Sequence, residues 1–274
     1  ANRIRPRPVV PARGMIYDRQ GRLLAENLPA FRLDITPDKA GDTERVLAEL
    51  GRLIALSEEE LEHFRKERKS GRGFRPITLK LRLSDEEMAA FAVNRWRFPG
   101  VEMEPYLTRH YPYGDLFAHV IGYVGRIDEK DLEQLGDGGA ALTHIGKTGI
   151  ERSYEELLRG KVGYEQIETN VQGRALRTVG RVAATPGADL RLSIDAELQR
   201  ATVAAFGELE GTAVAMDPRT GQILAMVSLP SYDANLFVNG ISHADYRALM
   251  DNPSRPQFNR LVLGGVAPGS TLKP

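Results

Sequence analysis

The chain has 274 residues, no cysteine, and a formal net charge of zero from 37 basic and 37 acidic side chains. Its length allows one or two domains with ample core. The balanced charge argues against a nucleic-acid-binding protein, and the absence of cysteine excludes disulfides and thiolate metal sites. No apolar run approaches the roughly 20 residues that cross a bilayer.

The chain opens on a basic, proline-rich stretch, ANRIRPRPVVPARG (residues 1–14). This stretch lacks the apolar centre that a signal peptide carries. We interpret it as an extended linker or juxtamembrane segment whose upstream part has been removed.

Four stretches carry the pattern of a helix start. Ser57 and Ser84 are each followed three residues later by a glutamate, which predicts a capping box. Asp128 and Ser242 are the predicted caps of two further helices. The acidic residues at these starts are favoured by the helix dipole, so we interpret them as structural rather than as a catalytic carboxylate pair. The first two helices are expected to pack together through four apolar residues: Leu61, Phe64, Met88 and Phe91.

Strand patterns lie between these helices. Two apolar runs within residues 212–230 flank the stretch DPRTG, whose composition is typical of a turn, so we predict a hairpin. Shorter strands are predicted at residues 31–37, 164–173 and 188–195, and Asp195 is the predicted N-cap of the next helix. Before about residue 185 the sequence is Arg-rich and irregular, and after it a helix, a hairpin and a helix follow. We therefore place a domain boundary near residue 185.

The stretch HIGKTG (residues 144–149) invites comparison with a phosphate-binding loop, but that motif needs a glycine where Ala141 stands. We interpret it as a tight connection in which Gly146 and Gly149 adopt positive φ. The five histidines show neither i, i+4 pairing nor metal-ligand spacing. We therefore expect neither a metal ion nor a cofactor.

Ser270 and Lys273 form a Ser-x-x-Lys pattern in the stretch GVAPGSTLKP. A proline and a glycine precede Ser270, so a new helix is predicted to begin there, and residues i and i+3 share a helical face. A serine hydroxyl becomes a nucleophile when a base takes its proton, and a lysine serves as that base when burial or a positive potential lowers its pKa. The bare pattern also arises by chance, so the pair is either coincidental or belongs to the front part of a longer enzyme.

Six segments, in order, resemble the class B penicillin-binding proteins, and within them the elongation type. Three resemble the N-terminal motifs of the family: RGMIYDRQGRLLAEN (13–27), RHYPYGDLFAHVIGYVGRID (109–128) and GKTGIERSYEELLRG (146–160). Three more resemble the entry to its transpeptidase domain, the first hairpin of that domain and the run into the catalytic serine: PGADLRLSIDAELQ, AVAMDPRTGQILAMVSLPSYDANLF and FNRLVLGGVAPGSTLKP. The resemblance covers essentially the whole chain.

This resemblance implies an α+β fold. Residues 1–185 are expected to form an elongated, non-catalytic pedestal (dimerisation-type) domain with a helical head subdomain at about 35–108. Residues 186–274 are expected to form the first, incomplete part of the transpeptidase domain. Four charged residues of the N-terminal motifs should meet in one junction of paired ions, because unpaired buried charges are costly: Arg13, Arg109, Glu151 and Arg152.

The resemblance also implies a peptidoglycan D,D-transpeptidase of cell elongation, in which Ser270 is the acylated nucleophile and Lys273 its base. The implied partners are stem peptides ending in D-Ala-D-Ala, β-lactams, a membrane glycosyltransferase and scaffold proteins of the elongation machinery, but no nucleic acid. The implied location is the bacterial inner membrane, with a single-pass anchor missing from this chain and the soluble part in the periplasm.

The sequence also departs from the family pattern. The family uses a Ser-x-Asn motif and a Lys-Ser/Thr-Gly strand after the catalytic serine. No Ser-x-Asn occurs here, and the Lys-Thr-Gly at residues 147–149 precedes Ser270, so we reject it as the active-site strand. The 274-residue chain alone is therefore expected to be inactive. Two alternatives remain: a pedestal that binds the glycosyltransferase and scaffold proteins without chemistry of its own, and a division-type transpeptidase.

Overall fold

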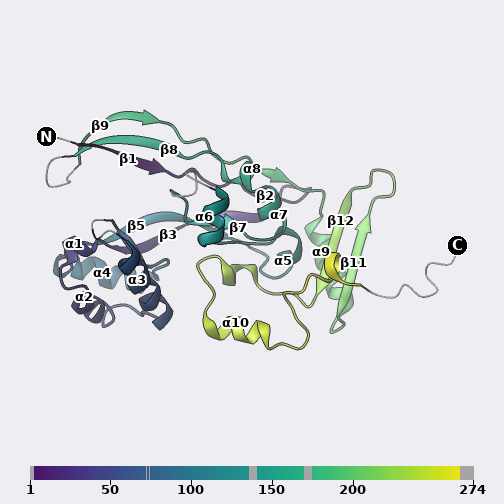
Figure 1. Ribbon diagram of the computed structural model, residues 1–274. Helices are drawn as coiled ribbons and strands as arrows, with labels where there is room; N and C mark the ends of the chain where they lie inside the picture. Colours follow the sequence, from purple (N-terminus) through teal and green to yellow (C-terminus); the bar gives the residue numbers. More distant parts are fainter. Residues whose placement is uncertain (1–2, 72, 74, 136–140, 170–174, 266–274) are drawn as a thin grey trace. The chain divides into compact units, whose positions relative to one another are not determined.

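The computed structural model describes residues 3–71, 73, 75–135, 141–169 and 175–265 (Figure 1). The chain forms two compact units. The main unit comprises Ala1–Asn27 and Arg109–Pro274, and the head unit comprises Leu28–Thr108. Both combine helices with mostly antiparallel strands, so the fold is α+β, as expected.

The head unit packs helices against a small antiparallel sheet. Its helices are α1 (Pro37–Ala40), α2 (Thr43–Leu50), α3 (Glu58–Ser70), α4 (Asp85–Asn94) and the 3-10 turn η1 (Arg95–Arg97). Strand β3 (Leu23–Ile35) enters the unit and pairs with β4 (Ile77–Lys80) and with β5 (Val101–His110). The strand predicted at residues 31–37 is thus the end of β3.

Capping boxes begin the two longest helices of the head unit, as predicted. The Ser57 and Ser84 side chains accept hydrogen bonds from the backbone N–H of Glu60 and Glu87, whose carboxylates accept from the caps in return. These bonds satisfy donors that the first helical turn leaves free. The predicted packing is also confirmed by one apolar core that contains Leu61, Phe64, Met88 and Phe91.

A three-stranded antiparallel sheet lies at the start of the main unit. Its order is β1 (Arg3–Val9), β8 (Gly163–Thr169), β9 (Ala175–Val182), and the three strands run side by side in Figure 1. Pro6 and Pro8 lie in β1, which is an edge strand, because proline cannot donate a ladder hydrogen bond. The strand predicted at residues 164–173 corresponds to β8, and its last residues lie outside the described part of the chain.

The middle of the main unit consists of short elements around an apolar core. Strand β2 (Ile16–Tyr17) pairs with β3 and, in parallel, with β10 (Leu190–Arg191). The strand predicted at residues 188–195 is therefore only two residues long. The other elements are α5 (Ala118–Ile121), β6 (Val124–Arg126), α6 (Glu129–Leu135), β7 (His144–Gly146), α7 (Gly149–Ser153) and α8 (Glu155–Arg159). Asp128 caps α6 as predicted, because its Oδ1 accepts from the backbone N–H of Asp131 at 2.9 Å.

The two glycines of HIGKTG have different physical roles. Gly149 has the predicted positive φ, 58°. Gly146 is not among the positive-φ residues and ends strand β7, so that part of the prediction is wrong. A Cβ at Gly146 would lie 2.1 Å from the carbonyl oxygen of Glu151, so the position needs glycine for a close approach rather than for its φ angle.

The last part of the main unit contains a helix, a hairpin and shorter helices. Helix α9 (Ala196–Phe206) is capped by Asp195, and α10 (His243–Met250) is capped by Ser242, both as predicted. The predicted hairpin is formed by β11 (Gly211–Met216) and β12 (Ile223–Leu229). The 3-10 turn η3 (Ala234–Phe237) and helix α11 (Arg260–Leu263) follow.

Candidate active site

The predicted nucleophile and base, Ser270 and Lys273, lie outside the residues that the structure describes. The last described helix before them is α11, which packs against both strands of the hairpin. The described part of the site is therefore its approach: α9, the hairpin and α11.

Helix α11 is fixed at its first turn by side chains. Asn259 Oδ1 accepts a hydrogen bond from the backbone N–H of Leu261 at 3.1 Å. Ser228 Oγ, on β12, accepts from the backbone N–H of Arg260 at 3.0 Å. Two of the free donors of the helix start are thus satisfied, one of them by the hairpin itself. The start of α11 is therefore held directly on β12.

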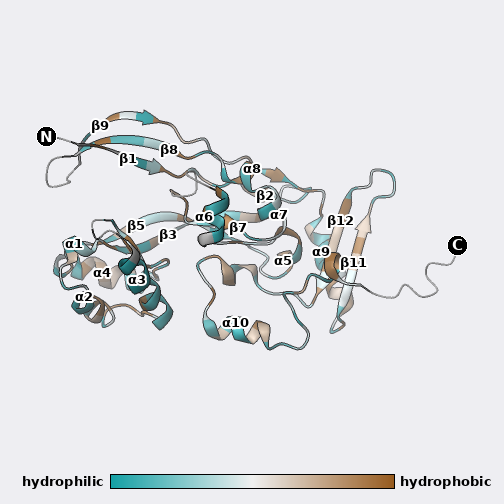
Figure 2. Ribbon diagram, in the orientation of Figure 1, coloured by the Kyte–Doolittle hydropathy of each residue, from teal (hydrophilic) through white to brown (hydrophobic). Residues whose placement is uncertain are grey.

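A groove of about 580 Å³ lies beside α11. The side chains of Val262 and Leu263 line it and are 66% and 68% exposed, and Figure 2 shows α11 as largely hydrophobic. Tyr154 and Tyr232 line other parts of the groove. The approach to Ser270 thus presents apolar surface that the described residues leave uncovered.

Gln199 joins α9 to β12 through a buried amide. Its Oε1 accepts from the backbone N–H of Met226 at 2.8 Å, and its Nε2 donates to the carbonyl of Met226 at 2.8 Å. The same Nε2 donates to the carbonyl of Leu116 at 3.1 Å. Sequence reasoning missed Gln199 and Asn259, because an amide that binds distant backbone has no local sequence pattern.

A buried ionic junction brings together the three N-terminal motifs. Arg13 Nε donates to Glu151 Oε2 at 2.7 Å, and Arg109 Nε donates to Glu151 Oε1 at 2.7 Å. Arg13 also pairs with Glu155 at 2.8 Å. Glu151 is fully buried and Arg109 is 5% exposed. Three of the four predicted charged residues therefore meet as expected.

Arg152, the fourth predicted member, is exposed and is not part of this junction. Successive residues of a helix point about 100° apart, so α7 cannot aim both Glu151 and Arg152 at the same place. The prediction was wrong for this residue because it treated a motif as a unit rather than resolving the faces of its helix.

Tyr111 completes the junction as a neutral group. Its hydroxyl donates to Glu151 Oε1 at 3.1 Å and accepts from the backbone N–H of Val124 at 2.8 Å. Burial raises the pKa of Tyr111 well above its ordinary value, and the negative charge of Glu151 raises it further. For Arg13, burial acts to lower the pKa, but the charges of Glu151 and Glu155 outweigh it, so the pKa is raised. The junction is thus a locked structural element and not an acid–base pair.

The Lys-Thr-Gly at residues 147–149 is part of the connection from β7 to α7. Lys147 Nζ donates to Asp128 Oδ2 at 3.1 Å and also to Asp131. Burial lowers the pKa of Lys147, but the hydrogen bonds to the two carboxylates outweigh this effect and raise it. Lys147 therefore stays charged and paired with two carboxylates, which is the role of a structural residue. This agrees with the rejection of the motif as an active-site strand.

Two further features of the described residues concern metal binding and membrane spans. No group of three or more histidine, cysteine, aspartate or glutamate side chains among them is arranged to hold a metal ion. In that same part of the chain, every helix is too short or too polar to cross a bilayer.

Comparison with known proteins identifies the family. The model described as "Penicillin-binding Protein dimerisation domain" matches residues 8–192, and that described as "Penicillin binding protein transpeptidase domain" matches residues 211–274. The chain is 44% identical to peptidoglycan D,D-transpeptidase MrdA of Haemophilus influenzae and 46% identical to that of Acinetobacter baumannii. These matches cover 100% of this chain but only 43% and 41% of those proteins.

A solved structure is also similar. It is a penicillin-binding protein (PBP2) from Helicobacter pylori in complex with MreC, with a TM-score of 0.76 and 29% identity, over 95% of this chain and 49% of that one. The chain therefore spans less than half the length of these relatives. Because the dimerisation model alone matches more than half of its residues, the chain belongs to the penicillin-binding proteins.

Proposed function

We propose that the complete protein is a peptidoglycan D,D-transpeptidase of cell elongation, with Ser270 as nucleophile and Lys273 as base. The observation that carries this proposal is the match of residues 211–274 to the transpeptidase family, which ends on a Ser-x-x-Lys pair. The names of the relatives, and the hairpin and capped helix that lead to Ser270, support it. We further propose that residues 1–185 form the pedestal, with its head at about 35–108, and residues 186–274 the start of the catalytic domain.

The proposed reaction is an acyl transfer in two steps. Lys273 takes the proton of the Ser270 hydroxyl as the oxygen attacks the carbonyl carbon of the penultimate D-Ala of a stem peptide. The peptide C–N bond breaks, the proton passes to the departing D-Ala amine, and an ester to Ser270 remains. The amine of a second stem peptide then attacks this ester, the ester C–O bond breaks, and the proton lost by the amine passes through Lys273 to the Ser270 oxygen. A β-lactam reacts in the same first step. The Ser270 oxygen attacks the carbonyl of the lactam ring, the ring C–N bond breaks, and the opened ring stays attached to Ser270 as an ester.

Exposed apolar side chains support the idea that further transpeptidase residues cover this region in the complete protein. On the hairpin, Val214 and Met216 are 51% and 55% exposed, and they lie on one face of β11 because side chains alternate along a strand. Val262 and Leu263 on α11, which packs against the hairpin, add further exposed apolar side chains. The relatives contain more than twice the length of this chain, which is enough to supply such a cover.

The experiment is a turnover assay of the complete protein on a synthetic stem pentapeptide that ends in D-Ala-D-Ala. We expect release of D-Ala and formation of a cross-linked product, both lost in Ser270→Ala. A protein that releases D-Ala equally well after this substitution would contradict the proposed role of Ser270. Depletion in cells then separates the two types of transpeptidase, because loss of side-wall synthesis gives rounded cells and loss of division gives filaments.

A second proposed function is that the head unit binds a scaffold protein. The relative from Helicobacter pylori was solved in complex with MreC. In this chain, Val93 and Trp96 are 76% and 83% exposed at the end of α4 and in η1, beside a groove of about 560 Å³. Exposed aromatic and apolar residues next to a hollow are typical of protein interfaces. We also propose that the complete protein is anchored in the inner membrane, with its main body in the periplasm. There the head unit would bind the scaffold protein, and a membrane glycosyltransferase would be a second partner.

Calorimetry with the MreC protein of the same bacterium tests this second proposal. We expect Trp96→Ala to weaken binding at least tenfold. The control is Leu107→Ala, a residue of the same unit that is 53% exposed on β5. Equal affinity of the Trp96→Ala variant and the unmodified protein would exclude this surface.

A further inference from the structure

Four polar side chains from the second half of the main unit bind the main chain of one short stretch, residues 111–119. Each donates to a different carbonyl of this 111–119 segment. The pairs are Asn235 Nδ2 to Tyr111 at 2.9 Å, Ser231 Oγ to Asp115 at 2.7 Å, Gln199 Nε2 to Leu116 at 3.1 Å, and Asn259 Nδ2 to His119 at 3.0 Å. Such a series fixes a backbone without depending on its side chains.

The 111–119 segment is itself held firmly. Phe117 and Ala118 are buried in the apolar core of the main unit. At the other end, Tyr111 is hydrogen-bonded to Glu151 of the ionic junction. The segment is therefore a rigid support, anchored at one end by the ionic junction and at the other by the apolar core.

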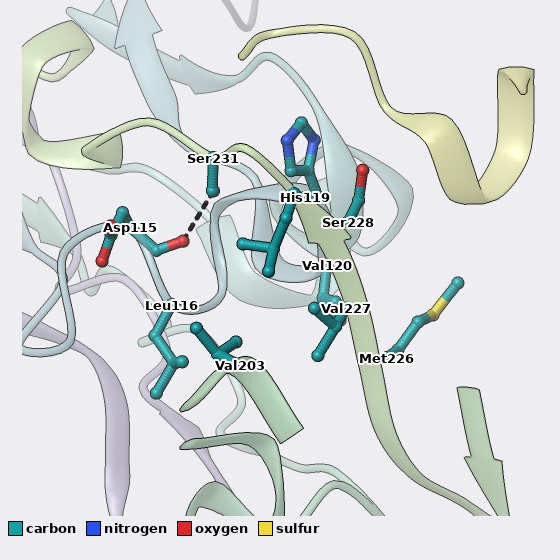
Figure 3. Close-up of a pocket in the computed structure, with 10 residues that line it drawn as sticks. Asp115, Leu116, His119, Val120, Val203, Met226, Val227, Ser228 and Ser231 are labelled. Atoms are coloured by element: carbon teal, nitrogen blue, oxygen red, sulfur yellow. Dashed lines mark hydrogen bonds between the residues drawn. The ribbon is translucent and has the colours of Figure 1, made fainter. Parts of the chain in front are cut away.

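The four donors lie on the elements that lead to Ser270. Figure 3 shows Asp115, Leu116 and His119 beside β12, with the hydrogen bond from Ser231 drawn as a dashed line. These residues and the β12 residues Val227 and Ser228 line one small cavity of about 30 Å³. The 111–119 segment and β12 thus pack closely.

Asn259 has two functions in this arrangement. Its Oδ1 caps α11 through Leu261, and its Nδ2 holds the carbonyl of His119. One amide thereby fixes both the start of α11 and its place on the rigid segment. Ser270 follows Leu263 by only seven residues along the chain. The position of a nucleophile must be held to within about 0.5 Å for efficient reaction. The helix that precedes Ser270 in the chain, α11, must therefore be held in a fixed position.

We infer that Asn259 is a positioning residue for the acylation of Ser270, acting by tying α11 to the carbonyl of His119. The inference rests on the proposed transpeptidase function. Asn259→Asp separates the two functions of the amide. The aspartate still accepts a hydrogen bond from Leu261, but it cannot donate to His119 and places a carboxylate against that carbonyl.

The experiment measures acylation of the complete protein by a chromogenic β-lactam in stopped flow, which separates the dissociation constant of the first complex from the acylation rate constant. For Asn259→Asp we expect the rate constant to fall at least tenfold while the dissociation constant changes less than threefold. The matched control is Asn94→Asp in the head unit, which also loses an asparagine donor to a main-chain carbonyl, that of Ala90 at 2.9 Å, but has no part in the 111–119 segment. It should acylate within threefold of the unmodified rate.

The outcomes distinguish the inference from a purely structural role and from failure of the proposed function. If Asn259→Asp melts at a lower temperature but its folded fraction acylates at the unmodified rate, the inference is overturned. If the variant does not fold, Asn259→Ser provides the same test, because serine keeps a capping oxygen without reaching His119. If the unmodified protein is not acylated on Ser270, the proposed function fails and the inference falls with it.

Discussion

Arg13 and Glu151 are 138 positions apart in the sequence, yet the Arg13 Nε donates a hydrogen bond of 2.7 Å to the Glu151 carboxylate. Arg109 holds the other oxygen of the same carboxylate at 2.7 Å. The buried Glu151 carboxylate thus joins its own segment to those of Arg13 and Arg109 in the main unit. Its contribution to stability is open to measurement.

Replacement of Glu151 by glutamine should destabilise the main unit by about 3–5 kcal/mol, because it leaves two buried guanidinium groups without their shared counter-charge. Urea unfolding followed by circular dichroism measures the change. The control is Glu165→Gln, which removes a pair with Arg7 whose arginine is 65% exposed. A pair of this kind contributes about 0–1 kcal/mol. An equal fall in the free energy of unfolding in the two variants would show that the buried junction contributes no more than a surface ion pair.

Replacement of Ser84 by alanine should lower the stability of the head unit by about 1 kcal/mol, because the backbone N–H of Glu87 loses its cap. Ser84→Asp keeps a capping oxygen and should melt near the unmodified protein. Acylation by penicillin in the complete protein should be unchanged in both. Identical melting curves for Ser84→Ala and the unmodified protein would argue against the cap.

The stability of the main unit should fall in acid because of His144. Burial lowers the pKa of this imidazole to about 4, and the charge of Arg126 also acts to lower it. In the unfolded chain the ring titrates near pH 6.5. The unfolded chain therefore takes up a proton between pH 6.5 and 4 that the folded protein rejects, so the contribution is present above pH 6.5 and lost progressively toward pH 4. The full loss is on the order of 3 kcal/mol.

Melting temperatures between pH 7 and pH 4 test this dependence, with His144→Gln as the variant. The variant should lose part of the pH dependence and not all of it, because burial also lowers the pKa of His119, which acts in the same direction. The control is the same replacement at the exposed His243, which should keep the slope of the unmodified protein. A slope that is identical in His144→Gln and in the unmodified protein would contradict the assignment.

Local features of the structure were predictable from sequence because their causes are local. Ser57, Ser84 and Asp195 cap helices through residues two or three positions away, and the hairpin follows from a turn between two apolar runs. Features that depend on distant neighbours were missed or misread. Gly146 is required by the carbonyl of Glu151 rather than by its own φ angle, and Arg152 points away from the junction that its neighbour completes.

Residues of the candidate site could be predicted from the sequence only where they belong to a recognisable motif. Ser270 and Lys273 were identified from their spacing and from the family pattern, and they remain proposals because they lie outside the described residues. Gln199 and Asn259 were not identified, because their partners are main-chain carbonyls that any sequence would provide. Only the folded arrangement shows that both amides reach the 111–119 segment.

The central claim is that Ser270 is the nucleophile of a penicillin-binding transpeptidase, and one measurement tests it most directly. The complete protein is incubated with labelled penicillin, and the site of the adduct is located by peptide mass mapping. We expect one adduct per protein, on Ser270, absent in Ser270→Ala and in Lys273→Ala. A protein limited to residues 1–274 should stay unlabelled at the same concentration, because it lacks the Ser-x-Asn and later Lys-Thr-Gly elements. A stoichiometric adduct on another residue, or none on the complete protein, would contradict the account.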